Sequence, residues 1–221
     1  MPQLSDFHLG ADVVAGDGRN VGKLASLIVE ESGFDLRAIV VKEEESFAGR
    51  LLAAESLFIT DEVVIPIAAV ESATHDLIRL SMSVPDIRRQ PPYLTYRFKP
   101  ADLKTSALDD LEVLTGGIGM PSVEQVARKG DGQIEIDRGE NVMLGTTGRR
   151  LGRVQDVLVD RGELIGIVMR PDGFFKRDVV LPIRFIDRAD DLALFAHLDE
   201  ADIEHLKPFV DGEAEGTIPT E

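Results

Sequence analysis

An all-β fold made of two small barrels is predicted by two observations: the chain repeats itself, and the repeated blocks alternate apolar and polar residues as strands do. The block around Gly18 and Gly22 aligns with the block around Gly148 and Gly152 at a constant offset of 130. Glycines at this spacing suit a short turn, because glycine adopts positive φ at no steric cost. We therefore expect a strand, a turn and a longer strand at the start of each copy.

The next blocks of the two copies also match. Residues 63–66 and 179–182 share a Val-Val-aliphatic-Pro pattern at an offset of 116, so the first copy has the longer middle connection. Proline cannot donate a hydrogen bond to a ladder, so Pro66 and Pro182 are expected at a bulge, a bend or a sheet edge. Each copy then ends on an apolar alternation, at residues 77–80 and 192–195. The β-branched runs argue against helices in these blocks.

Both copies resemble PRC-barrel domains, and the second copy is the better match. The resemblance rests on these segments: Gly148-Arg-Arg-Leu-Gly152, Ile165-Gly-Ile-Val-Met169 and Val179-Val-Leu-Pro182. The first copy departs in having Glu30 and Glu31 where the second has Asp160 and Arg161, and in its added connection over residues 43–61. Such domains occur in the H subunit of photosynthetic reaction centres, in ribosome maturation factors of the RimM type and in stand-alone proteins. The resemblance implies a small β-barrel fold and brings no catalytic set.

The repeat divides the chain into four segments. We expect barrels over residues 1–83 and 134–198, a Pro-rich and partly helical linker over 84–133, and an acidic helix and tail over 199–221. Within these we expect helices at residues 101–114, 122–128 and 199–210. The second of them is favoured by a capping box, since Gln125 follows Ser122 by three positions. We also expect the residues before Tyr93 to dock on the first barrel, with Tyr93, Tyr96 and Phe98 as anchors.

Composition excludes several kinds of chemistry. There is no Cys, which removes disulfides, Cys-bound zinc, iron–sulfur clusters and thiol catalysis. The four His residues show no metal-binding spacing, and no nucleophile has an identifiable base, so we expect no metal, no cofactor and no enzyme. No basic and apolar leader and no apolar run of about 18 residues is seen, which predicts a cytoplasmic protein without membrane association.

Charge is unevenly distributed along the chain. The net charge of −16 argues against direct nucleic-acid binding, which needs a positive footprint. The acid is concentrated in residues 1–83 and 199–221, whereas residues 134–198 carry 10 basic and 11 acidic residues. Nine of those ten basic residues are Arg, which suits planar and bidentate contacts. The second copy is therefore the half that we expect to meet a partner.

The candidate interface lies in the second copy. Pro-Asp-Gly at residues 171–173 is a turn signal, and the adjacent Phe174 and Phe175 cannot both face inward on a strand. Aromatic and Arg side chains are common interface anchors. We therefore expect a protein-binding surface formed by Phe174, Phe175, Arg149, Arg150 and Arg177. The alternative is that one Phe closes the barrel end and the other covers the linker.

The leading hypothesis is a non-enzymatic interaction or adaptor module with an unidentified protein partner. Alternatives are a ribosome-maturation or RNA-processing role like that of the RimM type, and a soluble protein associated with a photosynthetic reaction centre, although the H subunit has an N-terminal membrane helix that this sequence does not show. A fourth is an enzyme that cradles phosphate on the Gly-rich residues 115–122. Two barrels in one chain can pair with each other or across a homodimer.

Overall fold

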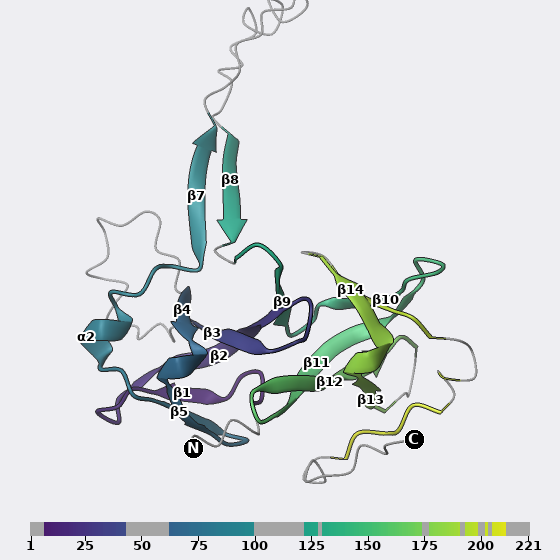
Figure 1. Ribbon diagram of the computed structural model, residues 1–221, viewed down its shortest axis with the longest axis horizontal. Coiled ribbons are helices and arrows are strands. Elements are labelled where there is room, and N and C mark those ends of the chain that lie inside the picture. Colours follow the sequence, from purple (N-terminus) through teal and green to yellow (C-terminus); the bar gives the residue numbers. More distant parts are fainter. Residues whose placement is uncertain are drawn as a thin grey trace, which may run out of the picture.

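The computed structural model describes residues 7–42, 62–99, 122–127, 130–173, 177–190, 193–198, 202 and 205–210, with no side-chain detail for 94–99 and 122–127. It confirms the all-β fold: two main sheets lie side by side, and a two-stranded hairpin projects away from them (Figure 1). The two sheets have the same strand order. The long strand of each, β2 and β11, lies near the middle of that order.

The first sheet has the order β4-β3-β2-β1-β6-β5, with β1 and β6 parallel and the other neighbours antiparallel. Its elements are β1 (Asp12–Val14), β2 (Asn20–Glu30), β3 (Leu36–Lys42), β4 (Glu62–Pro66), the 3₁₀ turn η1 (Ile67–Ala69), β5 (Val70–Ala73) and β6 (Leu77–Leu80), followed by the one-turn helix α2 (Val84–Ile87).

The second sheet has the matching order β13-β12-β11-β10-β15-β14, again with one parallel pair, β10 and β15. Its elements are β10 (Asn141–Leu144), β11 (Arg150–Asp160), β12 (Glu163–Pro171), β13 (Val179–Pro182), the 3₁₀ turn η2 (Ile183–Phe185), β14 (Ile186–Ala189) and β15 (Ala193–Ala196). Between the two sheets along the chain lie β7 (Leu94–Lys99), β8 (Ser122–Ala127) and β9 (Gln133–Asp137).

Strand register corrects the predicted offset by one residue. Val13 pairs with Gly22 in the first copy and Val142 pairs with Gly152 in the second. Positions before the glycine turn therefore correspond at an offset of 129, and positions after it at 130. The predicted constant offset is wrong upstream of the turn because the second turn is one residue longer.

The two prolines lie where a missing N–H is tolerated, as predicted. Pro66 and Pro182 are the last residues of β4 and β13, which end their sheets in the strand order, and each leads directly into a 3₁₀ turn. At such a position proline removes no ladder hydrogen bond from a central strand.

The structural repeat continues past the two sheets. The N–H of Tyr93 donates to the Glu62 carbonyl at 2.9 Å, and 116 positions later the N–H of Phe209 donates to the Asp178 carbonyl at 2.7 Å. The helix predicted over residues 199–210 is therefore wrong for its second half: Asp202 is helical, but 206–210 run along the edge of β13. Pro208 disfavours a continued helix, and the unpaired edge of β13 supplies hydrogen-bond partners.

Tyr93 anchors the start of the linker on the first sheet, as predicted. Its ring is only 3% exposed and packs with Ile28, Ala38 and Val40, and its hydroxyl donates to Glu135. The side chains of the other two predicted anchors, Tyr96 and Phe98, and the helix predicted over 101–114 lie outside the described residues.

The helix predicted over residues 122–128 is wrong. Ser122–Ala127 forms β8, which pairs antiparallel with β7 from Leu94↔Ala127 to Lys99↔Ser122. A capping box is a local signal of about 1 kcal/mol, and it was outweighed by the pairing of β8 with a strand made of alternating Thr, Tyr, Arg and Phe.

The two copies meet through the tips of their longest hairpins. The N–H of Leu164 donates to the Phe34 carbonyl at 3.0 Å, and the N–H of Leu36 donates to the Gly162 carbonyl at 2.9 Å. These are equivalent positions of the two copies. Ala38 of β3 pairs with Pro66 and Gly166 of β12 pairs with Pro182, so residues of β12 follow their equivalents in β3 by 128 positions. Each tip therefore gives the other the same contact, as in an isologous dimer interface.

A second reciprocal contact involves the residues that precede each sheet. Strand β9 leaves the second copy and pairs with the far half of β2, with Ser26 opposite Asp137. In the other direction, Asp156 of β11 accepts hydrogen bonds from the His8 ring at 2.7 Å and from the Leu9 N–H at 2.8 Å. His8 and Asp137 are equivalent positions. The two barrels thus pair with each other within one chain about an approximate two-fold axis.

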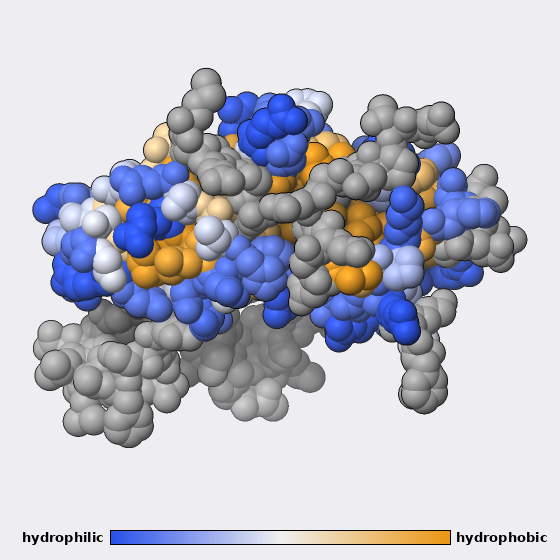
Figure 2. All heavy atoms as spheres, turned by 90° about the horizontal axis from the view of Figure 1, so that it is seen from below, coloured by the Kyte–Doolittle hydropathy of each residue, from blue (hydrophilic) through white to orange (hydrophobic). Residues whose placement is uncertain are grey.

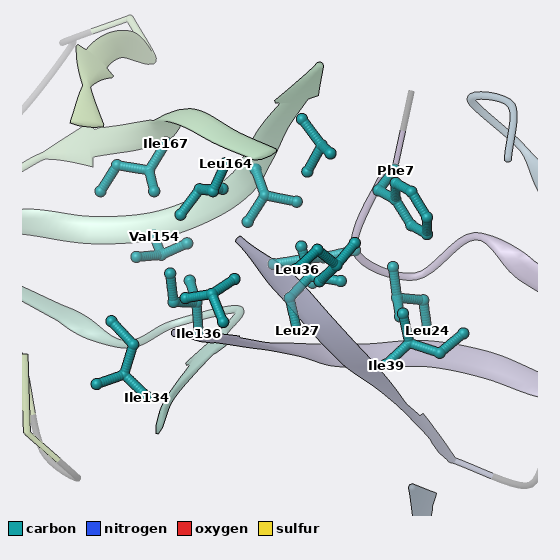
Figure 3. Close-up of a cluster of buried hydrophobic side chains, with 14 of the residues drawn as sticks. Phe7, Leu24, Leu27, Leu36, Ile39, Ile134, Ile136, Val154, Leu164 and Ile167 are labelled. Atoms are coloured by element: carbon teal, nitrogen blue, oxygen red, sulfur yellow. The ribbon is translucent and has the colours of Figure 1, made fainter. Parts of the chain in front are cut away.

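The exchange joins the two barrels into one hydrophobic core. Figure 3 shows residues of β2 and β3, of β9, and of β11 and β12 packed in one cluster. Leu36 and Leu164, from the two hairpin tips, are 4% and 0% exposed, and Ile134 and Ile136 of β9 are buried among residues of both copies. Each such side chain contributes about 1.5–3 kcal/mol to folding. Neither copy buries this surface without the other.

Replacing Gly152 by Ala tests the close approach of β11 to β12. A Cβ at Gly152 would lie 2.2 Å from the Arg170 carbonyl oxygen, whereas one at Gly33 would lie 3.7 Å from its nearest neighbour. We expect Gly152→Ala to lower the free energy of unfolding by about 1–3 kcal/mol and Gly33→Ala to leave it nearly unchanged, as measured by urea denaturation. Equal stability of the two variants would contradict the described packing.

Replacing Asp156 by Ala tests the contact between the copies. It leaves the partly buried His8 ring and the Leu9 N–H without their acceptor, so we expect a loss of about 1–3 kcal/mol in urea denaturation. The control is Asp76→Ala, because the Asp76 side chain is exposed and contacts, among the described residues, the exposed His75 ring. We expect that change to stay within about 0.5 kcal/mol. A control as destabilising as Asp156→Ala would contradict the assignment.

Candidate functional site

A groove of about 530 Å³ opens at one end of the second barrel. It lies where the turn before β11, the end of β12, the start of β13 and the segment that follows the second sheet come together. Its lining residues are Arg149, Arg150, Leu151, Met169, Pro171, Asp172, Arg177, Val179, Leu206 and Pro208.

The floor of the groove is apolar. Leu151 and Met169 are buried members of the shared core, and Val179 and Leu206 pack against it while remaining partly exposed. Leu206 is held there because the backbone carbonyl of its neighbour Lys207 accepts a hydrogen bond from the Val180 N–H at 2.9 Å. In the view of Figure 2, apolar residues reach the surface on both halves of the molecule and are bordered by hydrophilic ones. The groove therefore offers apolar surface beside charged groups.

Two of the Arg residues around the groove are held by carboxylates of the same copy. The Arg150 Nε donates to Asp172 at 2.8 Å. Next to the groove, Arg170 donates to both oxygens of Asp178 at 2.8 and 2.9 Å, and this hydrogen bonding raises the pKa of Arg170 above its ordinary value. In each pair the two charges cancel, so neither pair adds net charge.

Arg149 and Arg177 are exposed, and within the described part of the chain neither has a carboxylate within 4.0 Å. A guanidinium group presents several N–H donors in a fixed planar arrangement and stays charged at any physiological pH. The groove thus combines an apolar floor with two cations that are free to bind an anionic group. Among the lining residues that the structure describes, there is no Ser, Thr, Cys or His.

Of the five residues predicted to form an interface, the structure brings Arg149, Arg150 and Arg177 together around this groove. Phe174 and Phe175 lie outside the described residues, between Gly173 and Arg177. Sequence reasoning missed the contributions of Leu206 and Pro208, which it had assigned to a helix. The signal was present: Pro208 follows Pro92 by the same 116 residues that separate the two proline strands.

The structure also shows a histidine contact that the sequence did not indicate. The rings of His8 and His75 lie 3.9 Å apart at an interplanar angle of 37°, although 67 positions separate them. Each ring also contacts a carboxylate, Asp156 for His8 and Asp76 for His75. Of the Gly-rich residues 115–122, only Ser122 is described, as the first residue of β8.

The equivalent surface of the first copy is arranged differently. Arg19 corresponds to Arg149, but its guanidinium donates to Asp17 at 2.6 and 2.9 Å. Thr147 stands in the second copy where Asp17 stands in the first, and its hydroxyl accepts a hydrogen bond from the Arg149 N–H at 3.3 Å. The hydrogen bond from Arg19 holds the pKa of Asp17 below its ordinary value. Arg19 is therefore paired within its own turn, whereas Arg149 has no carboxylate partner among the described residues.

Comparison with known families identifies the domain that the chain repeats. The PRC-barrel domain model matches residues 9–80 and 138–195, which together make up more than half of the chain. The chain belongs to the PRC-barrel family, and it carries two copies of that domain. A search of curated proteins gives no significant match. In the described part of the chain, no helix is both long enough and apolar enough to cross a membrane.

The Asp17–Arg19 pair predicts a measurable titration. By carboxyl NMR, we expect Asp17 to have a pKa below that of an ordinary aspartate, and Arg19→Gln to raise it toward that value. The pair stabilises the fold above the ordinary aspartate pKa, and this contribution is lost as the pH falls through the lowered pKa. Because both side chains are exposed, the effect on stability is small. Arg149→Gln is the control and should leave Asp17 unchanged; a pKa insensitive to Arg19→Gln would contradict the pairing.

Proposed function

We propose that this protein is a non-enzymatic interaction or adaptor module that holds a protein partner in the groove of its second PRC-barrel. The observation that carries the proposal is the combination of an apolar floor with Arg149 and Arg177, which have no carboxylate partner among the described residues. Protein interfaces are enriched in Arg and aromatic residues around a desolvated apolar centre. The neighbouring Phe174 and Phe175 add two aromatics to the same stretch of sequence.

The sequence and the site both favour binding over catalysis. The described lining residues offer cations and apolar atoms, which recognise a ligand, and they include no Ser, Thr or Cys nucleophile with a base, which would transform one. The proposal involves no cofactor and a cytoplasmic location, both on the grounds of the sequence. Binding in the groove uses residues of one chain only, so it does not require a homodimer.

The proposal is tested by affinity capture from the lysate of the native host, with three tagged proteins: the wild type, Arg149→Gln with Arg177→Gln, and Arg19→Gln. We expect a specific protein that is captured by the wild type and by Arg19→Gln, and that is lost with the double variant. The Arg19 variant is the matched control because it changes the equivalent position of the first copy.

Two outcomes would contradict the proposal. Capture that is equal for all three proteins would mean that the groove does not hold the partner. Capture of ribosomal proteins or RNA, decreasing steeply with salt, would favour the ribosome-associated alternative instead.

A further inference from the structure

We propose that the groove binds an acidic segment of the partner that also carries apolar side chains, and that only the second copy has this site. The inference rests on the proposed function and adds the chemistry of the ligand. Carboxylates of the segment would pair with Arg149 and Arg177, and its apolar side chains would cover Pro208 and the partly exposed Val179 and Leu206 above the buried Leu151 and Met169.

The charge preference follows from which carboxylates are already used. Asp172, the one acidic residue among the described lining residues, is bound to Arg150, and the neighbouring Asp178 is bound to Arg170. Arg149 and Arg177 remain as two positive charges beside an apolar floor. Pairs of guanidinium and carboxylate groups gain strength where apolar contact excludes water from them.

The distribution of charge along the chain makes the second copy a better place for an acidic peptide than the first. The chain has a net charge of −16, but residues 134–198 are almost neutral, with 10 basic and 11 acidic residues. Residues 134–198 therefore repel an acidic peptide less than the first copy does, and the attraction at the groove comes from Arg149 and Arg177. A nucleic acid needs many phosphate contacts over an extended surface, which two Arg residues in an acidic protein do not provide.

The apolar floor favours binding of a peptide over binding of a small anion. Leu151 and Met169 form part of a hydrophobic core and reach the groove from below, while Val179, Leu206 and Pro208 line its side. A free phosphate would use the two Arg side chains and leave this surface in water. A segment with Leu or Phe beside its carboxylates uses both, at about 25 cal/mol for each Å² of apolar surface covered.

Recognition must come from side chains, because the nearest strand edge is already occupied. The segment that follows the second sheet forms backbone hydrogen bonds with the edge of β13. The Val180 N–H donates to the Lys207 carbonyl, and the Phe209 N–H donates to the Asp178 carbonyl. A partner therefore cannot add a strand to β13 without displacing residues 207–209. This favours contact through carboxylate and apolar side chains.

Divergence between the copies makes the site specific. The position of Thr147 holds Asp17 in the first copy, Arg150 is replaced by Asn20, and Leu206 is replaced by Gln90. Each change removes a feature of the groove: the free cation, a second guanidinium and part of the apolar wall. The same fold therefore presents a binding groove in one copy and a self-paired surface in the other.

The test is fluorescence anisotropy with a labelled peptide that alternates Glu and Leu, and with two matched peptides in which Lys replaces Glu or Ser replaces Leu. We expect the Glu/Leu peptide to bind the wild-type chain and the other two to bind at least about tenfold more weakly, which corresponds to about 1.4 kcal/mol. Raising the salt concentration should weaken binding of the Glu/Leu peptide.

The decisive variant is Thr147→Asp, which places a carboxylate where the first copy has Asp17. It removes no residue of the groove, but gives Arg149 a local partner, so we expect at least about fivefold weaker binding. Arg149→Gln with Arg177→Gln should weaken it further, and Arg19→Gln should leave it unchanged. Urea denaturation of each variant shows that the fold is retained.

The inference would be overturned by equal binding of the Lys/Leu peptide or by no effect of Thr147→Asp and of the double variant. Displacement of the Glu/Leu peptide by inorganic phosphate, at a phosphate concentration equal to that of the peptide's carboxylates, would also overturn it. Binding only after residues 211–221 are removed would mean that this acidic stretch of the chain is the occupant, and would also overturn the inference.

If the peptide does not bind while affinity capture still depends on Arg149 and Arg177, the ligand chemistry is wrong and the proposed function stands. If capture does not depend on these residues, the function fails.

Discussion

The reciprocal pairing of the two copies is the constraint on which the rest of the structure depends. Backbone hydrogen bonds join the hairpin tips at equivalent residues, Phe34 with Leu164 and Leu36 with Gly162. Strand β9 crosses to the first sheet, and residues 8–9 contact Asp156 of the second. Because these contacts lie over a shared hydrophobic core, the two barrels are expected to unfold as one cooperative unit. A two-fold arrangement inside one chain gives every surface of the protein an equivalent on the other copy.

That internal symmetry makes differences between the copies informative. Where two equivalent positions have the same backbone contacts, a change of side chain alters chemistry without altering the fold. Asp17 and Thr147 both accept a hydrogen bond from the N–H two residues later, yet only Asp17 also binds the guanidinium of that residue. The first copy thus neutralises its Arg, and the second leaves its Arg exposed beside Met169 and Leu206. The fold explains where the groove lies, and these substitutions explain why it has a charge preference.

Much of the fold could be predicted from the sequence because its signals are local and occur twice. Alternating apolar residues, the Gly-x-x-x-Gly turns and the prolines at 66 and 182 predicted the strands and the sheet edges. The pairing of the copies could not be predicted, since it depends on contacts between residues more than a hundred positions apart, such as Leu9 with Asp156. For the site, sequence reasoning found the Arg residues through composition and a turn signal. It missed Leu206 and Pro208 because acidic residues near 199–204 resembled a helix start, whereas the hydrogen bonds to β13 determine that segment.

Equivalent surfaces of the two copies should differ in their ability to bind an acidic ligand that carries apolar side chains. Backbone amide NMR of the whole chain, titrated with the Glu/Leu peptide, measures this directly because both surfaces are observed in one sample. We predict saturable shifts at Arg149, Leu151, Met169 and Val179, and none at Arg19, Val21, Val41 and Val63, which occupy the corresponding positions of the first copy. Shifts of equal size on both copies, or shifts confined to strands distant from the groove, would contradict it.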